Sequence, residues 1–240
     1  SGIASVVVSD NGGPAKPVPV TLTSGTHALT ITAKDVAGNS RSTTLNLTID
    51  TDGPIITPSI TGTEGNNNWY VSDVDVTATV SDPVSGMDGT LEVSVDGGAW
   101  TNELPIHFTE GEHTVDLRAY DEAGNESIKT LTINVDTTPP ALSTSTSGTL
   151  GNSGWYISDA TTTITATDST SDIDYIEYKQ NSADWKNGIS VLSNDGINTI
   201  TARVYDLAGN SAAQSLEVKV DTVAPTVMPV VPTPTGLDNW

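Results

Sequence analysis

Apolar and polar residues alternate with a period of two along much of this chain. In the segment 113–120, Val115, Leu117 and Ala119 are separated by polar side chains. The same alternation occurs at 27–33 and at 198–204. A period of two over this length predicts a half-buried β-strand, with one row of side chains on a core and the other in solvent. No segment shows a convincing helical period.

Other alternating segments predict further strands, at 45–49, 74–80, 91–95, 131–135, 160–166, 176–180 and 216–220. Thr, Val and Ile are abundant in these segments, and Gly and Pro residues separate them. Short strands divided by turn residues are typical of an antiparallel sandwich. We therefore predict an all-β fold.

Several motifs recur along the chain at a spacing of about 85 residues. Ala-Gly-Asn occurs at 37–39, 123–125 and 208–210; Asp-Thr occurs at 50–51, 136–137 and 221–222; Trp occurs at 69, 155 and 240. A fixed period of this size indicates a tandem array of small domains. About seven strands fit into each period, which predicts tandem immunoglobulin-like sandwiches.

The repeat also predicts the domain boundaries. Ser85-Gly86 follows Trp69 by 16 residues, and Ser1-Gly2 is its equivalent in the preceding period. We expect a first repeat that lacks its first strands, two complete repeats, and the opening strand of a further repeat, at 1–53, 54–139, 140–225 and 226–240. Because a sandwich without two strands exposes an open edge, we expect preceding chain or another molecule to complete the first repeat. Pro54, Pro139 and Pro225 are expected to stiffen the linkers.

Charge narrows the choice of partners. Thirty acidic and nine basic residues give a formal charge of −21. This balance disfavours nucleic acid and anionic membranes, which both require a basic face, and it favours divalent cations. No apolar stretch approaches the roughly 20 residues of a membrane helix, so we expect no membrane insertion of this segment. The chain contains no Cys, so no disulfide supports the small cores.

The motifs resemble those of a known family. The resemblance is carried by GEHTVDLRAYDEAGNESIKTLTINVDTTPP at 111–140 and by its counterparts at 25–54 and 196–225. These segments resemble the bacterial immunoglobulin-like repeats of large surface adhesins and biofilm-associated extracellular proteins. The resemblance covers the whole chain and implies an extracellular or cell-surface location. It does not imply a particular ligand.

Three hypotheses for function follow. The leading one is a structural stalk or fibre segment of a secreted or cell-surface protein, acting in adhesion, presentation or extracellular matrix. Its expected partners are other copies or further repeats of the same protein, with polysaccharide or a host or cell-surface ligand as further possibilities. The alternatives are a carbohydrate-binding accessory module of a secreted enzyme and a fibre subunit that assembles by β-strand complementation.

Acidic residues at strand ends are the candidate metal ligands. The linkers, the ends of the second strands and the ends of the penultimate strands meet at one pole of a sandwich. These segments carry Asp50, Asp52, Asp82, Asp121, Asn125, Asp136, Asp168, Asp206 and Asn210. Hard oxygen ligands suit Ca²⁺, so we predict structural calcium at the inter-repeat junctions. The alternative is turn chemistry, because Asp and Asn side chains cap turns of their own backbone.

Other residues gave weaker signals. Trp100 and Trp185 occupy equivalent positions and could stack on sugars or pack on their own sheet. His27 and His113 are equivalents, whereas Asn198 occupies that position in the next repeat, so a polar bond to a loop is expected instead of catalysis. No nucleophile set, phosphate loop or HExxH motif occurs. We therefore expect no enzymatic activity and no cofactor besides calcium.

Overall fold

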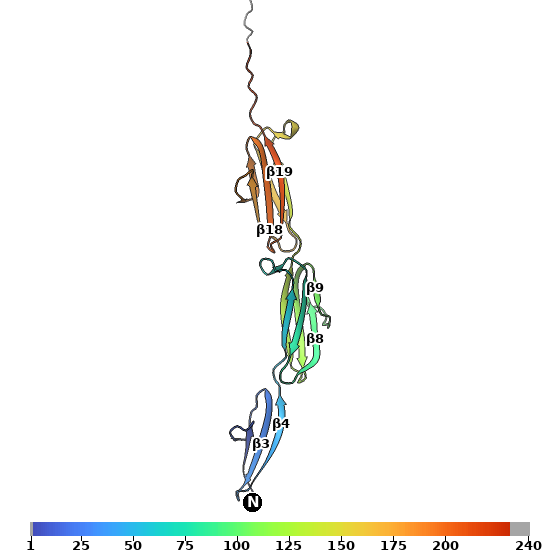
Figure 1. Ribbon diagram of the computed structural model, residues 1–240, viewed down its shortest axis with the longest axis vertical. Helices are drawn as coiled ribbons and strands as arrows, with labels where there is room; N and C mark the ends of the chain where they lie inside the picture. Colours follow the sequence, from blue (N-terminus) through green and yellow to red (C-terminus); the bar gives the residue numbers. More distant parts are fainter. Residues whose placement is uncertain (1, 231–240) are drawn as a thin grey trace, which may run out of the picture. The chain divides into compact units, whose positions relative to one another are not determined.

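The computed structural model describes residues 2–230, and β-strands make up nearly all of its regular structure (Figure 1). Within that range the one helical segment is a 3-10 turn, Asn152–Gly154. No helix among residues 2–230 is long and apolar enough to cross a membrane. The chain divides into two compact units, Ser1–Thr137 and Thr138–Trp240.

The first repeat contributes one sheet to the first unit. Its strands are β1 (Ile3–Asp10), β2 (Lys16–Pro17), β3 (Gly25–Asp35) and β4 (Ser40–Ile49), in the order β2-β1-β3-β4. Val8, His27 and Leu29 are buried on one face of this sheet. No second sheet covers that face within residues 2–53, so this repeat has few fully buried apolar side chains.

The second repeat forms two sheets. One consists of β5 (Ile55–Thr61), β7 (Val74–Ser81) and β9 (Ile106–Phe108), in that order. The other consists of β6 (Trp69–Tyr70), β11 (Glu126–Val135), β10 (Gly111–Asp121) and β8 (Met87–Val95), in that order. The sheets differ in size because β6 adds to the edge of β11 through a short parallel pairing.

The core of the second repeat lies between these sheets. Val74 and Val76 of β7 pack with Val115 and Leu117 of β10, and all four side chains are fully buried. Their spacing of two along each strand is the alternation seen in the sequence, and the intervening polar side chains face outwards. Complete burial of a valine or leucine stabilises the fold by about 1.5–3 kcal/mol relative to exposure.

The second unit has the same two-sheet architecture as the second repeat. One sheet consists of β12 (Ala141–Ser147), β14 (Ala160–Thr167) and β17 (Ser190–Ser193). The other, in the order β13-β19-β18-β15-β16, consists of β13 (Trp155–Tyr156), β19 (Ser211–Val220), β18 (Gly196–Asp206), β15 (Ile173–Gln180) and β16 (Lys186–Asn187). Ile164, Ile200 and Val218 belong to its core.

The predicted all-β, tandem immunoglobulin-like fold is confirmed. The long alternating segments are β3, β10 and β18, and each pairs with the strand that follows it. The repeat boundaries at 53, 139 and 225 stay predictions from the sequence. The predicted opening strand at 226–240 falls partly on residues 226–230, which belong to no strand, and otherwise outside the described residues.

Candidate metal centre

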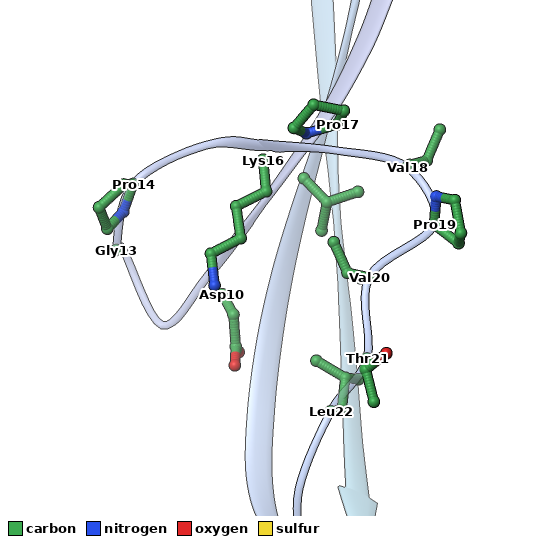
Figure 2. Close-up of a pocket in the computed structure, with 11 residues that line it drawn as sticks. Asp10, Gly13, Pro14, Lys16, Pro17, Val18, Pro19, Val20, Thr21 and Leu22 are labelled. Carbon is green, nitrogen blue, oxygen red and sulfur yellow. The ribbon is translucent and has the colours of Figure 1, made fainter.

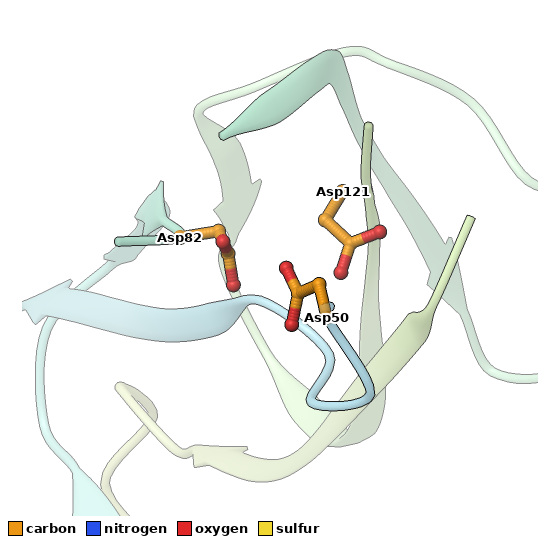
Figure 3. A group of neighbouring side chains, drawn as sticks. All are labelled: Asp50, Asp82 and Asp121. Carbon is orange, nitrogen blue, oxygen red and sulfur yellow. The ribbon is translucent and has the colours of Figure 1, made fainter. Parts of the chain in front are cut away.

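Three aspartates from distant parts of the first unit come together. Asp50 follows β4, Asp82 follows β7, and Asp121 is the last residue of β10. Each offers a carboxylate oxygen, and these oxygens lie within 4.8 Å of one another. Figure 3 shows the three carboxylates around a common space. The sequence analysis assigned all three residues to one junction, and the fold brings them together.

Backbone amides hold Asp82 in place. Its Oδ1 accepts hydrogen bonds from the amides of Val84 at 2.9 Å, Ser85 at 2.9 Å and Gly86 at 3.2 Å. This is the turn chemistry that the sequence left open as an alternative. All three bonds go to Oδ1, which leaves Oδ2 for another ligand.

Asp121 is held by the loop that follows it. The backbone amide of Asn125 donates to Asp121 Oδ1 at 2.8 Å, and the Asn125 side-chain amide donates to Oδ2 at 2.8 Å. Asp121 is 2% exposed, so its charge is withdrawn from water. Gly124, with φ of +90°, supplies the left-handed turn that lets this loop fold back.

Asp50 connects the linker to both repeats. Its Oδ2 accepts from the amide of Ser85 at 3.0 Å, and its Oδ1 accepts from the Ser24 hydroxyl at 3.4 Å and from the Asp52 amide at 3.3 Å. The nearby Ser85 hydroxyl, together with these amides, holds the pKa of Asp50 below its ordinary value. Asp50 is therefore ionised at neutral pH.

Asp52 and Asn125 stand beside the three carboxylates in other roles. The Asn125 side-chain amide donates to the backbone carbonyls of Asp50 at 3.4 Å and Asp52 at 3.3 Å, in addition to Asp121. It therefore connects the linker to the loop after β10. The three-carboxylate group does not include Asp52. Metal ligation by Asp52 and Asn125 stays a prediction.

Three carboxylates this close repel one another unless a cation or protons neutralise them. Ca²⁺ takes six to eight oxygens in a flexible geometry, and carboxylates bind it through one or both oxygens. Three carboxylates with water and backbone carbonyls match this donor preference. No Cys or His belongs to the group, so the donor set is the hard one that suits Ca²⁺ better than zinc.

In the second unit, a carboxylate oxygen of Asp168 lies within 4.8 Å of one of Asp206. Asp168 Oδ1 accepts from the amides of Thr170 and Ser171, at 2.9 and 3.0 Å. Asp206 Oδ1 accepts from the amides of Gly209 and Asn210, at 2.7 and 2.8 Å. These bonds repeat the turns around Asp82 and Asp121.

The other oxygen of Asp206 is the strongest sign of a cation. Asp206 is 1% exposed, and its Oδ2 has no hydrogen-bond partner among the described residues. A buried carboxylate oxygen without a donor is costly, and a bound cation removes that cost. Asp136, the predicted third member of this set, is the penultimate residue of the first unit, where its backbone amide donates to the Tyr70 carbonyl at 2.9 Å. Ligation by Asp136 and Asn210 stays a prediction from the repeat.

An arginine side chain covers one face of each of Trp100 and Trp185. The guanidinium carbon of Arg118 lies 4.0 Å from the Trp100 ring centre, and Arg203 lies at the same distance from Trp185. Glu92 fixes Arg118 through contacts at 2.6 and 2.9 Å. One face of each ring is therefore occupied, which supports the packing interpretation of these tryptophans.

His27 makes the loop contact that the sequence predicted. Its Nε2–H donates to the Thr23 carbonyl at 2.8 Å, and its Nδ1 contacts Asp10 Oδ2 at 2.7 Å. Both ring nitrogens face acceptors, and the pKa of His27 is raised by the Thr23 carbonyl and the Asp10 carboxylate. In the third repeat, Asn198 bonds the equivalent loop carbonyl without a charge.

The sequence analysis missed one further contact that holds the linker. Glu110 Oε2 accepts from the amide and hydroxyl of Thr137, at 3.1 and 2.9 Å. In the second unit, Asp195 Oδ1 accepts from the amide and hydroxyl of Thr222, at 2.9 and 3.0 Å. The signal for this contact was an acid directly before the Gly that opens β10 and β18, each paired with the Thr of an Asp-Thr motif; Ser24 takes that place before β3.

Comparisons with known proteins show what this chain is similar to. No curated protein sequence matches the chain. Among solved structures, a tetra-tandem repeat from the extending region of a large adhesion protein shares 17% identity at a TM-score of 0.37, covering 91% of this chain and 66% of that one. A Ca²⁺-stabilized adhesin of an Antarctic bacterium that binds ice shares 14% identity at a TM-score of 0.26, covering 92% and 65%. Fibronectin(III)-like modules of Clostridium thermocellum CbhA share 15% identity at a TM-score of 0.33, covering 73% and 100%.

A family profile identifies the repeats themselves. The profile described as Bacterial Ig-like domain matches residues 2–51 and 55–137, which together make up more than half of the chain. The two matches fall on the two sequence repeats on either side of the Asp50 linker. This chain therefore belongs to the bacterial Ig-like domain family.

Proposed function

We propose that this chain is a stalk or fibre segment of a secreted or cell-surface bacterial protein. The observation that carries the proposal is the acidic group at the linker between two bacterial Ig-like repeats, where Asp50 meets Asp82 and Asp121. A linker that is fixed to the next sandwich turns a string of domains into a spacer of defined length. Such a spacer presents or connects other parts of a surface protein.

Ca²⁺ is the ion that this group is proposed to hold. Asp50, Asp82 and Asp121 would be its ligands, and the bound ion would neutralise their mutual repulsion. The bound ion would connect the linker to the ends of β7 and β10, so the direction in which the next repeat leaves becomes fixed. By the sequence repeat, Asp136, Asp168 and Asp206 are the equivalent set for the following junction.

A calcium titration followed by isothermal calorimetry tests this proposal. The chain should bind Ca²⁺ in preference to Mg²⁺, because Mg²⁺ demands a smaller and stricter octahedral site. Asp50→Asn should remove one binding event. Asp88→Asn is the matched control, because Asp88 caps an exposed turn through Thr90 and lies outside the acidic group. Equal heats from the wild type and Asp50→Asn would contradict the assignment.

Location and partners belong to the same proposal. We propose that the chain lies outside the cell or on its surface, with further repeats of the same protein as its first partners and polysaccharide or a host surface ligand as further partners. Antibodies against the chain should label intact cells of the producing bacterium. Labelling that requires permeabilised cells would contradict a surface location.

A further inference from the structure

The sheet of the first repeat borders a hollow of about 670 Å³. Apolar side chains line much of it, among them Val8, Pro17, Val18, Val20 and Leu22. Figure 2 shows the loop from Gly13 to Leu22 curving around this space, with the side chains of Val20 and Leu22 turned into it. A hollow with apolar side chains beside an open sheet is a surface that favours a partner.

The repeat identifies which segment borders the hollow. Val20–Leu22 precede the Gly-x-His motif of the first repeat by the same spacing as β9, Ile106–Phe108, precedes it in the second. In the second repeat, β9 pairs with β7, with Val74 opposite Phe108 and Val76 opposite Ile106. β17 pairs with β14 in the same way in the second unit. Among residues 2–230, no strand pairs with Val20–Leu22.

We propose that this hollow is an acceptor for a β-hairpin of the kind formed by β5 and β7. The incoming hairpin has apolar residues at alternate positions, and its second strand adds antiparallel to Val20–Leu22. The register of β7 on β9 places a residue like Val74 opposite Leu22 and one like Val76 opposite Val20. Its apolar side chains would fill the hollow over Val8 and Leu29. Its backbone would pair with the exposed edge.

The structure favours such a hairpin over a second copy of this chain. The hairpins β5–β7 and β12–β14 already cover their own cores, so neither is free to enter the hollow of a second copy. Residues 226–230 align with β5 and expose Val227, Met228 and Val230. However, β5 pairs with β7 and has no ladder with β9, so a single strand of this type leaves the edge at Val20–Leu22 uncovered.

A peptide with the sequence of residues 55–81 is the probe. Titrated into the whole chain, it should bind with 1:1 stoichiometry and slow the hydrogen exchange of the Val20, Thr21 and Leu22 amides at least tenfold. A peptide carrying V74D and V76D should bind at least tenfold more weakly. The titration is run in chelator, so that its result is independent of the proposed calcium site.

Chain variants provide the matched controls. Val20→Asp should abolish binding, whereas Val36→Asp should not, because Val36 is 72% exposed in the turn after β3. Joining residues 55–81 ahead of residue 1 through a Gly-Ser linker gives a second measurement that does not depend on peptide solubility. Unchanged exchange at residues 20–22 in both experiments would overturn the proposal. A concentration-dependent dimer of the chain that Val20→Asp abolishes would also overturn it, because a second copy would then be the occupant.

Discussion

Replacing Asp82 with Asn separates the two roles that this aspartate could have. Asp82 caps a turn through Oδ1, and an Asn side chain can accept the same three backbone hydrogen bonds. The substitution therefore keeps the turn and removes one negative charge from the group with Asp50 and Asp121. If the group binds calcium, the effect of the substitution on stability has opposite signs with and without the ion.

The magnitude follows from the spacing of the carboxylates. Unit charges 4.8 Å apart repel by about 0.9 kcal/mol in bulk water and by about 3.5 kcal/mol at an effective dielectric constant of about 20. Asp50 and Asp82 are half-buried, so the lower figure is closer. Asp82 has two such neighbours, and removing its charge stabilises the calcium-free unit by about 2 kcal/mol. A ligand at a thousandfold excess over Kd stabilises the folded protein by about 4.1 kcal/mol, and the variant loses this stabilisation because it does not bind the ion. In excess calcium, the variant is therefore less stable than the wild type by about 2 kcal/mol.

Thermal unfolding with and without calcium measures the stability change caused by Asp82→Asn in both conditions. At about 4 °C per kcal/mol, Asp82→Asn should melt roughly 8 °C above the wild type in chelator and roughly 8 °C below it in excess calcium. Asp88→Asn changes an exposed turn of similar chemistry, and it should shift the melting temperature by the same amount in chelator and in calcium. A shift of Asp82→Asn with one sign in both buffers would refute the calcium interpretation and leave turn formation as the role of Asp82.

Two further predictions concern pH and the core. The pKa of His27 is raised above 6.5 in the folded state, so its contribution to stability is complete below pH 6.5 and is lost as the pH rises through the folded pKa. Calorimetry from pH 6 to 8.5 should show that the melting temperature of the first unit falls as the pH rises. His27→Gln should make this fall smaller. The second unit, which has Asn198 at that position, should not show this loss. Leu117→Ala should cost about 2–5 kcal/mol in denaturant unfolding because Leu117 is fully buried; a cost under about 1 kcal/mol would contradict the packing described.

The sequence predicted the long strands well because their chemistry is periodic. In β10, Val115, Leu117 and Ala119 are all fully buried, and alternation alone indicated that face. The meeting of Asp82 and Asp121 was also predictable, because both residues end strands that finish at one pole of the sandwich. The repeat supplied the remaining information, since each motif could be compared with its own copies.

Features that depend on a few contacts could not be predicted. β6 is only two residues long and pairs in parallel with β11, so Trp69 shows no alternation that would indicate its burial. The stacking of Arg118 on Trp100 joins a loop residue to a strand residue, and although Trp185 and Arg203 repeat the spacing of 18 residues, that spacing alone does not indicate a contact. The side-chain amide of Asn125 donates to the linker carbonyls, a choice that the residue type alone does not determine.

Small-angle scattering with and without calcium is the most direct test of the stalk proposal. A compact chain of this length has a radius of gyration of about 18 Å. Three repeats built of ten-residue strands, each about 33 Å long, give a rod with a radius of gyration of roughly 30 Å. We predict a value near the larger figure in calcium and a broader distribution of lengths in chelator. A value near the compact figure, or scattering that calcium leaves unchanged, would contradict a calcium-stiffened stalk.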